Sequence, residues 1–90
     1  MKEALLQLLK QPVVVDTRSP WIYIGTLAEV RGDCLLLTNV DVHDSGETSI
    51  PKERYVLDSS KTGIHPNRHS VYVNLEYVVS VSLLADVIRF

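Results

Sequence analysis

Residues 21–40 read WIYIGTLAEVRGDCLLLTNV, and this stretch decides the fold of the chain. It predicts two long strands, residues 21–30 and 34–40. Between them, Arg31-Gly32-Asp33 predicts a hairpin turn, because glycine supplies the positive φ that tight hairpin turns require. Gly25 lies near the start of the first strand, where a glycine relieves the crowding at a bend or a bulge. Two long strands with these features indicate a small, strongly curved barrel.

The residues before this hairpin predict a helix and a further strand. Within residues 2–11, four leucines fall inside two turns among good helix formers. Pro12 ends the predicted helix, because the residue before a proline is pushed out of the helical region. The β-branched run at residues 13–16 predicts the first strand.

The second half of the chain alternates polar loops with short apolar segments. Residues 41–52 and 59–69 are rich in turn formers and predict loops. The apolar segments predict strands at residues 53–58, 71–73 and 77–83. The first of these is either a separate strand or a continuation of the strand before it, and the last alternates so that its serines face solvent. A kink is expected at residues 74–76, and residues 84–90 are either a short helix or an extended tail.

One helix followed by about five short strands is the pattern of an all-β protein. The predicted fold is a small, strongly bent, five-stranded SH3-like barrel with a short N-terminal helix. No helices alternate with the strands, which excludes a doubly wound α/β fold. The 90 residues suit a single domain. We expect residues 1–11 to form the helix, residues 13–84 the barrel and residues 85–90 a C-terminal tail.

Composition sets limits on the partners. The chain is 46% hydrophobic and 22% charged, which is typical of a folded protein. Its formal net charge of −2 argues against a nucleic acid or an anionic membrane as partner. The single cysteine, Cys34, forms no intrachain disulfide, fits a reducing cytoplasm and is expected in the core. No apolar run approaches the roughly 20 residues of a membrane span, so we expect a cytoplasmic protein with no membrane partner.

Two motifs carry a resemblance to a known family. The first is Tyr23-Ile24-Gly25-Thr26-Leu27 with Val30, followed by an apolar strand at residues 36–41. The second is a short strand and kink at residues 71–75 with a last short strand at 78–81. Both resemble motifs of the Sm/LSm-like family, as a divergent, bacterial or phage Sm-like member would show them. The resemblance covers most of the chain and implies the Sm-like fold and a ring of identical subunits joined through strand edges.

Departures from the family pattern bear on function. RNA-binding members carry an aspartate and an asparagine where this chain has Arg31 and Leu35, and an arginine–glycine pair where it has Asn74-Leu75. Asp33 is close to the first of these positions but out of register. Because the missing residues carry the family's uridine pocket, the resemblance does not imply that pocket here. Arg31, Asp33 and Asn74 remain as candidate RNA-binding or ligand-binding residues.

Self-association also has a physical motive. A small barrel leaves unpaired backbone groups at the edges of its sheet, and edge pairing between identical subunits closes a cyclic interface. The candidate edge is the strand at residues 77–83. Its candidate interface residues are Tyr77, Val79, Val81 and Leu83. We therefore expect a cyclic homo-oligomer.

Side chains capable of chemistry are present, but their spacing is not distinctive. His65 and His69 are four residues apart, yet Pro66 disfavours the helix that would make this a metal site, so a solvated loop is the preferred interpretation. The run at residues 41–44 (DVHD) is better explained by turn residues and a hydrogen-bonding aspartate than by a bound ion. No catalytic motif is recognisable. The sequence thus predicts no enzyme activity, no metal and no cofactor.

A basic residue and several aromatic residues form one further candidate set: Arg18, Trp21, Tyr23, Tyr55, Tyr72 and Tyr77. Single-strand binders interleave cations and stacking faces in this way. Packing in the core or at an interface is the preferred interpretation.

Three functions therefore remain open. The favoured one is a non-enzymatic, ring-forming structural or interaction module that binds no RNA. The alternatives are an RNA-binding Sm-like protein with a non-standard pocket and a monomeric SH3-like or PRC-barrel adaptor.

Overall fold

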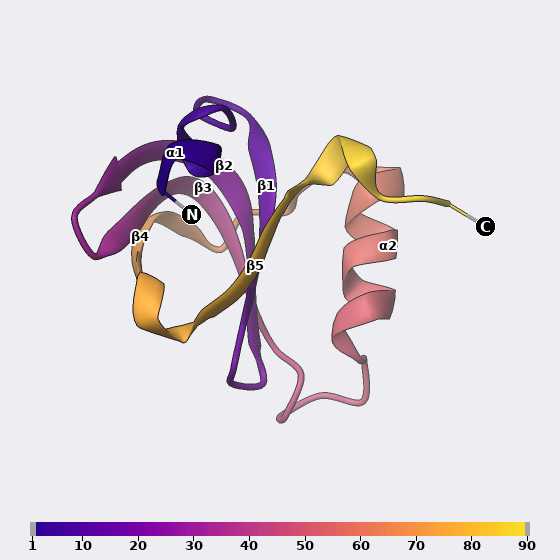
Figure 1. Ribbon diagram of the computed structural model, residues 1–90. Helices are drawn as coiled ribbons and strands as arrows, with labels where there is room; N and C mark the ends of the chain where they lie inside the picture. The colour runs from indigo at the N-terminus through magenta and orange to yellow at the C-terminus, as the bar shows by residue number, and fades with distance from the viewer. Residues whose placement is uncertain (1, 90) are drawn as a thin grey trace.

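The computed structural model describes residues 2–89 and contains one bent, five-stranded antiparallel sheet in the order β4-β3-β2-β1-β5 (Figure 1). The strands are β1 (Pro12–Thr17), β2 (Trp21–Arg31), β3 (Cys34–Asp44), β4 (Arg68–Asn74) and β5 (Val78–Leu83). The helices are α1 (Lys2–Leu6) and α2 (Lys52–Thr62), with 3-10 turns η1 (Leu75–Tyr77) and η2 (Leu84–Asp86). The predicted small all-β barrel with a short N-terminal helix is confirmed.

The β2–β3 hairpin has the predicted form. Gly32 lies in the turn with φ +44°, and Arg31 pairs with Cys34 across it. The register shifts twice along the hairpin, between Ile24 and Thr26 and between Leu27 and Glu29. Such bulges bend a strand and increase its twist, so the two shifts explain how β2 and β3 curl into a barrel.

Gly25 marks the first of these bulges because the opposite strand passes very close to it. A Cβ atom at this position would lie 3.1 Å from the carbonyl oxygen of Thr38 and 3.2 Å from the Cα of Val40. On β3, Asn39 takes up the extra residue with φ +51°, a conformation that asparagine tolerates better than most residues. The predicted bend at Gly25 is therefore confirmed.

The two faces of the sheet bury different clusters. Inside the curl lies the main core, made of Leu5, Val13, Val15, Leu27, Leu35, Leu37, Val40 and Val73. On the outer face lie Val14, Ile22 and Ile24, packed against partly buried Tyr55, Val56, Ile64 and Leu84. Figure 1 shows why the outer face is buried, since α2 stands against it on the side away from α1. Cys34 was expected in the core, but it is only half-buried at the start of β3.

The N-terminal helix is shorter than predicted. α1 ends at Leu6, whereas the prediction extended to residue 11. The chain turns through Lys10, at φ +67°, and the Lys10 N–H donates to the Leu27 carbonyl at 2.7 Å. Pairing with β2 therefore begins before Pro12 and ends the helix early. The predicted first residue of the helix, Met1, lies outside the described residues.

Helix α2 was not predicted from the sequence, and this is the largest difference between the predicted and the observed fold. Residues 53–58 were predicted as a strand, and they lie in the first two turns of an α-helix that begins at Lys52 and ends at Thr62. Both predicted loops are shorter as a result, since β3 continues to Asp44 and β4 begins at Arg68. The helix forms because its partly apolar face meets the outer sheet cluster, and tertiary packing of this kind outweighs β propensity.

A buried polar contact holds α2 to β3. The Tyr55 hydroxyl donates to the Asp41 carboxylate, with both oxygens at 2.6 Å, and Asp41 is only 2% exposed. The Tyr55 ring stacks on His43, with centroids 3.9 Å apart and planes 8° apart. His43 in turn lies 3.0 Å from the Ile50 carbonyl through Nε2. Burial and the Asp41 carboxylate both raise the pKa of Tyr55 well above its ordinary value of 10.0.

The chain returns from α2 to the sheet at Asn67. Its backbone N–H donates to the Val40 carbonyl at 2.9 Å. Its side-chain amide bonds both backbone groups of Val42, accepting from the N–H and donating to the carbonyl, each at 3.0 Å. An amide side chain here takes the place of one more residue of strand pairing.

The last part of the chain follows the prediction with small changes. The kink is a 3-10 turn capped by Asn74, whose side chain accepts from the Glu76 N–H at 3.0 Å. Tyr77 belongs to this turn, so β5 begins one residue later than predicted. Ser80 and Ser82 face solvent as expected. The tail contains a short 3-10 turn, η2, and its last predicted residue, Phe90, lies outside the described residues. Across residues 2–89, no helix has the length and apolar character needed to cross a membrane.

Candidate functional site

The sheet brings the three predicted ligand residues to one end. Arg31 pairs with Cys34 across the β2–β3 turn, and Cys34 pairs with Asn74 across β3 and β4. The carbonyl of Asp33 accepts from the Leu75 N–H at 2.8 Å. Arg31, Asp33 and Asn74 are all exposed there. The Arg31 guanidinium is already paired with Glu29 at 2.6 Å, which reduces the positive charge that this end offers to an anion.

The four predicted interface residues do not all lie on the surface. Val81 and Leu83 pack against the main core from the inner side of β5. Tyr77 and Val79 are exposed, by 55% and 57%. Val79 has no partner on β1, because the register shifts there between Asp16 and Thr17. The side chains available to a neighbouring molecule along this edge are therefore Tyr77 and Val79.

Four of the five candidate aromatic residues gather at one groove, which sequence spacing alone did not reveal. This aromatic groove has a volume of about 350 Å³ and is lined by Thr17, Ser19, Trp21, Tyr23, Tyr72, Val73, Asn74 and Tyr77. Its walls come from the ends of β1 and β4, the start of β2 and the η1 turn. Tyr55, the fifth aromatic residue, belongs to the separate contact between α2 and β3.

The rings of the aromatic groove differ in their surroundings. Trp21 and Tyr23 stack with centroids 6.5 Å apart, and burial raises the pKa of Tyr23 above 10.0. Tyr72 and Tyr77 are more than half exposed. The Arg18 guanidinium lies 5.4 Å from the centre of the Tyr77 ring and donates through Nη2 to the Glu76 carbonyl at 2.6 Å. The groove is thus lined by the stacked pair Trp21 and Tyr23, of which Trp21 is 39% exposed, and by the exposed rings of Tyr72 and Tyr77, with the Arg18 cation beside Tyr77.

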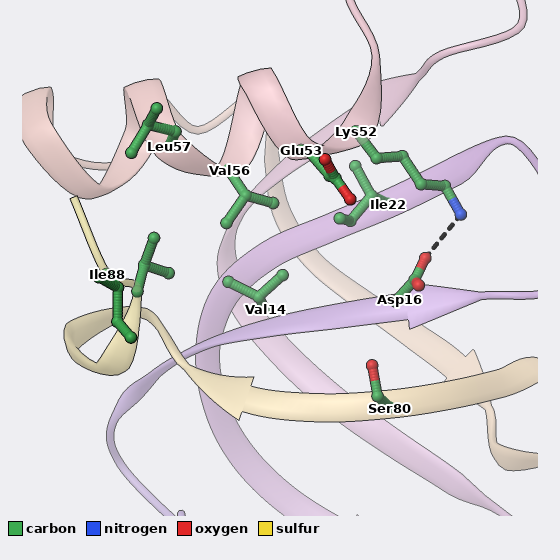
Figure 2. Close-up of a pocket in the computed structure, with 10 residues that line it drawn as sticks. Val14, Asp16, Ile22, Lys52, Glu53, Val56, Leu57, Ser80 and Ile88 are labelled. Carbon is green, nitrogen blue, oxygen red and sulfur yellow. Dashed lines mark hydrogen bonds and ion pairs between the residues drawn. The ribbon is translucent and has the colours of Figure 1, made fainter. Parts of the chain in front are cut away.

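A second cavity lies between α2 and the outer face of the sheet. Figure 2 shows Val14, Ile22, Val56, Leu57 and Ile88 around it, with Ser80 of β5 at one side. Its volume is about 430 Å³. At its mouth the Lys52 ammonium bonds the Asp16 carboxylate at 2.6 Å and the carbonyls of Thr17 and Ser19 at 3.0 and 2.7 Å. An ammonium has three N–H donors, so Lys52 is fully occupied as a structural link.

The histidine and aspartate candidates do not come together as a metal site. Within residues 2–89 there is no group of three or more metal-ligating side chains. His65 and His69 are exposed, with His65 in the coil before β4 and His69 within it. In the DVHD run, Asp41 and His43 contact Tyr55, and Asp44 accepts from the Gly46 N–H at 2.8 Å.

Comparison with known proteins relates this fold to that of a solved structure. No protein-family model matches the chain, and no curated protein matches its sequence. Among solved structures, it is similar to the Pyrococcus abyssii Sm protein in complex with a uridine heptamer. The likeness has a TM-score of 0.63 and covers 91% of this chain and 94% of that chain, at 12% sequence identity. This chain has the Sm-like fold.

The structure shows where the residues that depart from the RNA-binding pattern lie. Leu35, at the position where RNA-binding members are expected to carry an asparagine, is fully buried in the main core and pairs with Val73. A side chain in that position is directed to packing and not to a ligand. The feature of this Sm-like fold that the sequence analysis missed is a helix between β3 and β4. Its signals were Pro51 before the helix, Glu53 in the first turn and Gly63 after the end.

Proposed function

We propose that this Sm-like protein assembles into a ring of identical subunits and serves in the cytoplasm as a non-enzymatic structural or interaction module. The observation that carries the proposal is that β4 and β5 are the two edges of the sheet, each paired on one side only. Unpaired edge strands are templates for further pairing. Joining β4 of one subunit to β5 of the next uses both edges and generates a closed ring if the rotation closes.

The side chains along the two edges support this arrangement. Tyr72 on β4 is 61% exposed and Val79 on β5 is 57% exposed. Helix α1 contacts β2, and α2 covers the outer face, where it shares a cavity with Ser80 of β5. Exposed apolar side chains beside unpaired backbone are what an edge-to-edge interface buries. Such burial also supplements the core of a small domain, which is limited by its size.

Light scattering at micromolar concentration tests the ring. The expected mass is a whole multiple of the 10.1 kDa subunit. The variant Val79→Lys places a charge on the β5 edge and is expected to lower the mass to that of a monomer. Ile50→Lys is the matched control, because Ile50 is an exposed apolar residue (41%) in the segment between β3 and α2, off both edges. A monomeric parent protein would contradict the ring and favour the adaptor function.

Binding of single-stranded RNA is the alternative function. It is favoured by the gathering of Arg31, Asp33 and Asn74 at one end of the sheet and by the likeness to an Sm protein that holds a uridine heptamer. Fluorescence anisotropy with labelled oligo-U and oligo-A at low salt distinguishes the two functions. Affinity tighter than micromolar that weakens as salt rises supports RNA binding, whereas no binding at low salt favours the interaction module.

A further inference from the structure

We propose that the aromatic groove binds a short proline-rich peptide segment in the polyproline II conformation, with an acidic residue of the peptide near Arg18. This inference deepens the proposed interaction role by naming a class of partner. All eight lining residues come from one subunit, so the groove exists without the ring, but Tyr72 also lies on the β4 edge, where ring closure and peptide binding compete for its side chain.

The shape and lining of the groove carry the first part of the argument. Polyproline II segments dock in grooves lined by aromatic side chains, where the preformed helix loses little entropy on binding. Trp21 and Tyr23 stack on each other, and the exposed rings of Tyr72 and Tyr77 line the same groove. The volume of about 350 Å³ is at the small end of the range for ligand pockets, so the groove suits a short motif.

Unused hydrogen-bond donors carry the second part. Among residues 2–89, the hydroxyls of Tyr23, Tyr72 and Tyr77 have no hydrogen-bond partner, and neither does the Trp21 indole N–H. The Asn74 side chain accepts from Glu76, which leaves its N–H donors free. A polyproline II backbone has solvated carbonyls, and proline has no N–H. The free donors of the groove therefore match an acceptor-rich ligand.

The charge of the residues in and around the groove favours a peptide over a nucleic acid as its ligand. None of the eight lining residues carries a charge, and Arg18 is the cation at the rim. A nucleic-acid site normally gathers several Lys and Arg side chains along the path of the phosphates, and the net charge here is −2. One guanidinium, with N–H donors left beyond its bond to the Glu76 carbonyl, instead suits a single carboxylate on the peptide.

The position of the only tryptophan provides the test, since Trp21 lines the groove and its fluorescence reports directly on the site. The probe is a peptide of six prolines followed by two glutamates, and the control peptide replaces the prolines by glycine and serine. We expect a saturable change in Trp21 emission with the first peptide alone. Tyr72→Ala is expected to weaken binding by about tenfold, as for a hot-spot aromatic residue, whereas Ile50→Ala leaves it unchanged.

Arg18 variants test the acidic contact separately. Arg18→Gln is expected to weaken binding of the glutamate-bearing peptide but not of a peptide of prolines alone, and Arg18→Lys restores part of the difference. Light scattering before peptide is added separates the two proposals: a protein that is monomeric without peptide and still binds the peptide would overturn the ring and leave the groove assignment intact.

Three results would overturn the assignment. The first is the absence of any response to the proline peptide. The second is a salt-sensitive response to oligo-U in its place. The third is a Trp21 emission that changes with protein concentration and stops changing in Val79→Lys, which would assign the groove to a second copy of the chain.

Discussion

At the scale of single residues, Gly25 shows how one missing side chain permits the barrel to curl. The space that a Cβ would occupy is limited by backbone atoms of β3, at 3.1 and 3.2 Å. Backbone atoms in a paired strand cannot move as a flexible side chain can. The residue type at position 25 is therefore coupled to the curvature of the whole β2–β3 hairpin.

The substitution Gly25→Ala is expected to destabilise the protein by about 1–3 kcal/mol, the usual cost of overpacking a well-packed site. Urea denaturation followed by circular dichroism measures the change. Gly46→Ala is the matched control, since a Cβ there also meets an atom at 3.1 Å, but that atom belongs to the Asp44 side chain. Equal stability of Gly25→Ala and the parent would contradict the close packing of β2 on β3.

Tyr55 is the second residue with a measurable role. Tyr55→Phe removes the hydroxyl that donates to buried Asp41 and is expected to cost about 2 kcal/mol, because it leaves a buried acceptor without its partner. Thermal unfolding measures this loss. If Tyr55→Phe unfolds at the same temperature as the parent, the contact between α2 and β3 contributes nothing to stability.

The raised pKa of Tyr55 adds a dependence on pH. In the unfolded chain the phenol ionises near 10.0, and in the folded protein it ionises at higher pH. Above pH 10 the folded state therefore holds more protons than the unfolded state, and stability falls as pH rises. We expect this fall to be shallower in Tyr55→Phe. Denaturation at a series of pH values from 8 upward measures the slope, and identical slopes would contradict the assignment.

At the scale of elements, α2 depends on contacts at both of its ends. At its start, the Lys52 ammonium joins the helix to β1 and to the β1–β2 loop. Near its end, the Ser60 carbonyl accepts from the Arg89 guanidinium of the C-terminal segment at 2.5 Å. Between them, Val56 packs on the outer sheet cluster.

Lys52→Met keeps the length of the side chain and removes its three hydrogen bonds. We expect a loss of about 1 kcal/mol, reduced by the partial exposure of the Lys52–Asp16 pair, and faster exchange of the amide hydrogens of α2. Hydrogen exchange with mass spectrometry measures the second effect. Lys61→Met is the control, since Lys61 is exposed in the last turn of the same helix. Equal exchange in the two variants would contradict the role of Lys52.

The elements also show what the sequence could predict. The β2–β3 hairpin was predictable because its signals are local: Gly32 supplies the turn and Gly25 the bend. Helix α2 was not recognised because Tyr55, Val56 and Leu57 favour a strand locally, and the sheet face that stabilises them as a helix is distant in sequence. The aromatic groove was also not predictable as a site. Its aromatic residues lie on separate elements, which only the closed barrel brings together.

At the scale of the whole molecule, edge pairing and charge lead to different responses to salt. The proposed interface consists of backbone groups and exposed apolar side chains such as Tyr72 and Val79. Salt screens charge pairs at the surface but leaves apolar burial intact. We expect the assembled mass to stay constant from about 0.1 to 1 M salt, where the Debye length falls from about 10 to 3 Å. Dissociation at high salt, seen by light scattering, would indicate an interface of ion pairs instead.

The side-chain amide of Asn67 fixes the point at which the chain returns from α2 to β3, and this bears on where insertions are tolerated. The connection between β3 and β4, which contains α2, leaves β3 after Asp44 and returns to it where Asn67 bonds Val40 and Val42. Both ends of this connection are thus held on β3, so its length can change without changing the shape of the barrel. We expect its exposed stretch at residues 46–49 to accept an inserted foreign peptide without disturbing the sheet, and the proposed ring would then display that peptide once on every subunit.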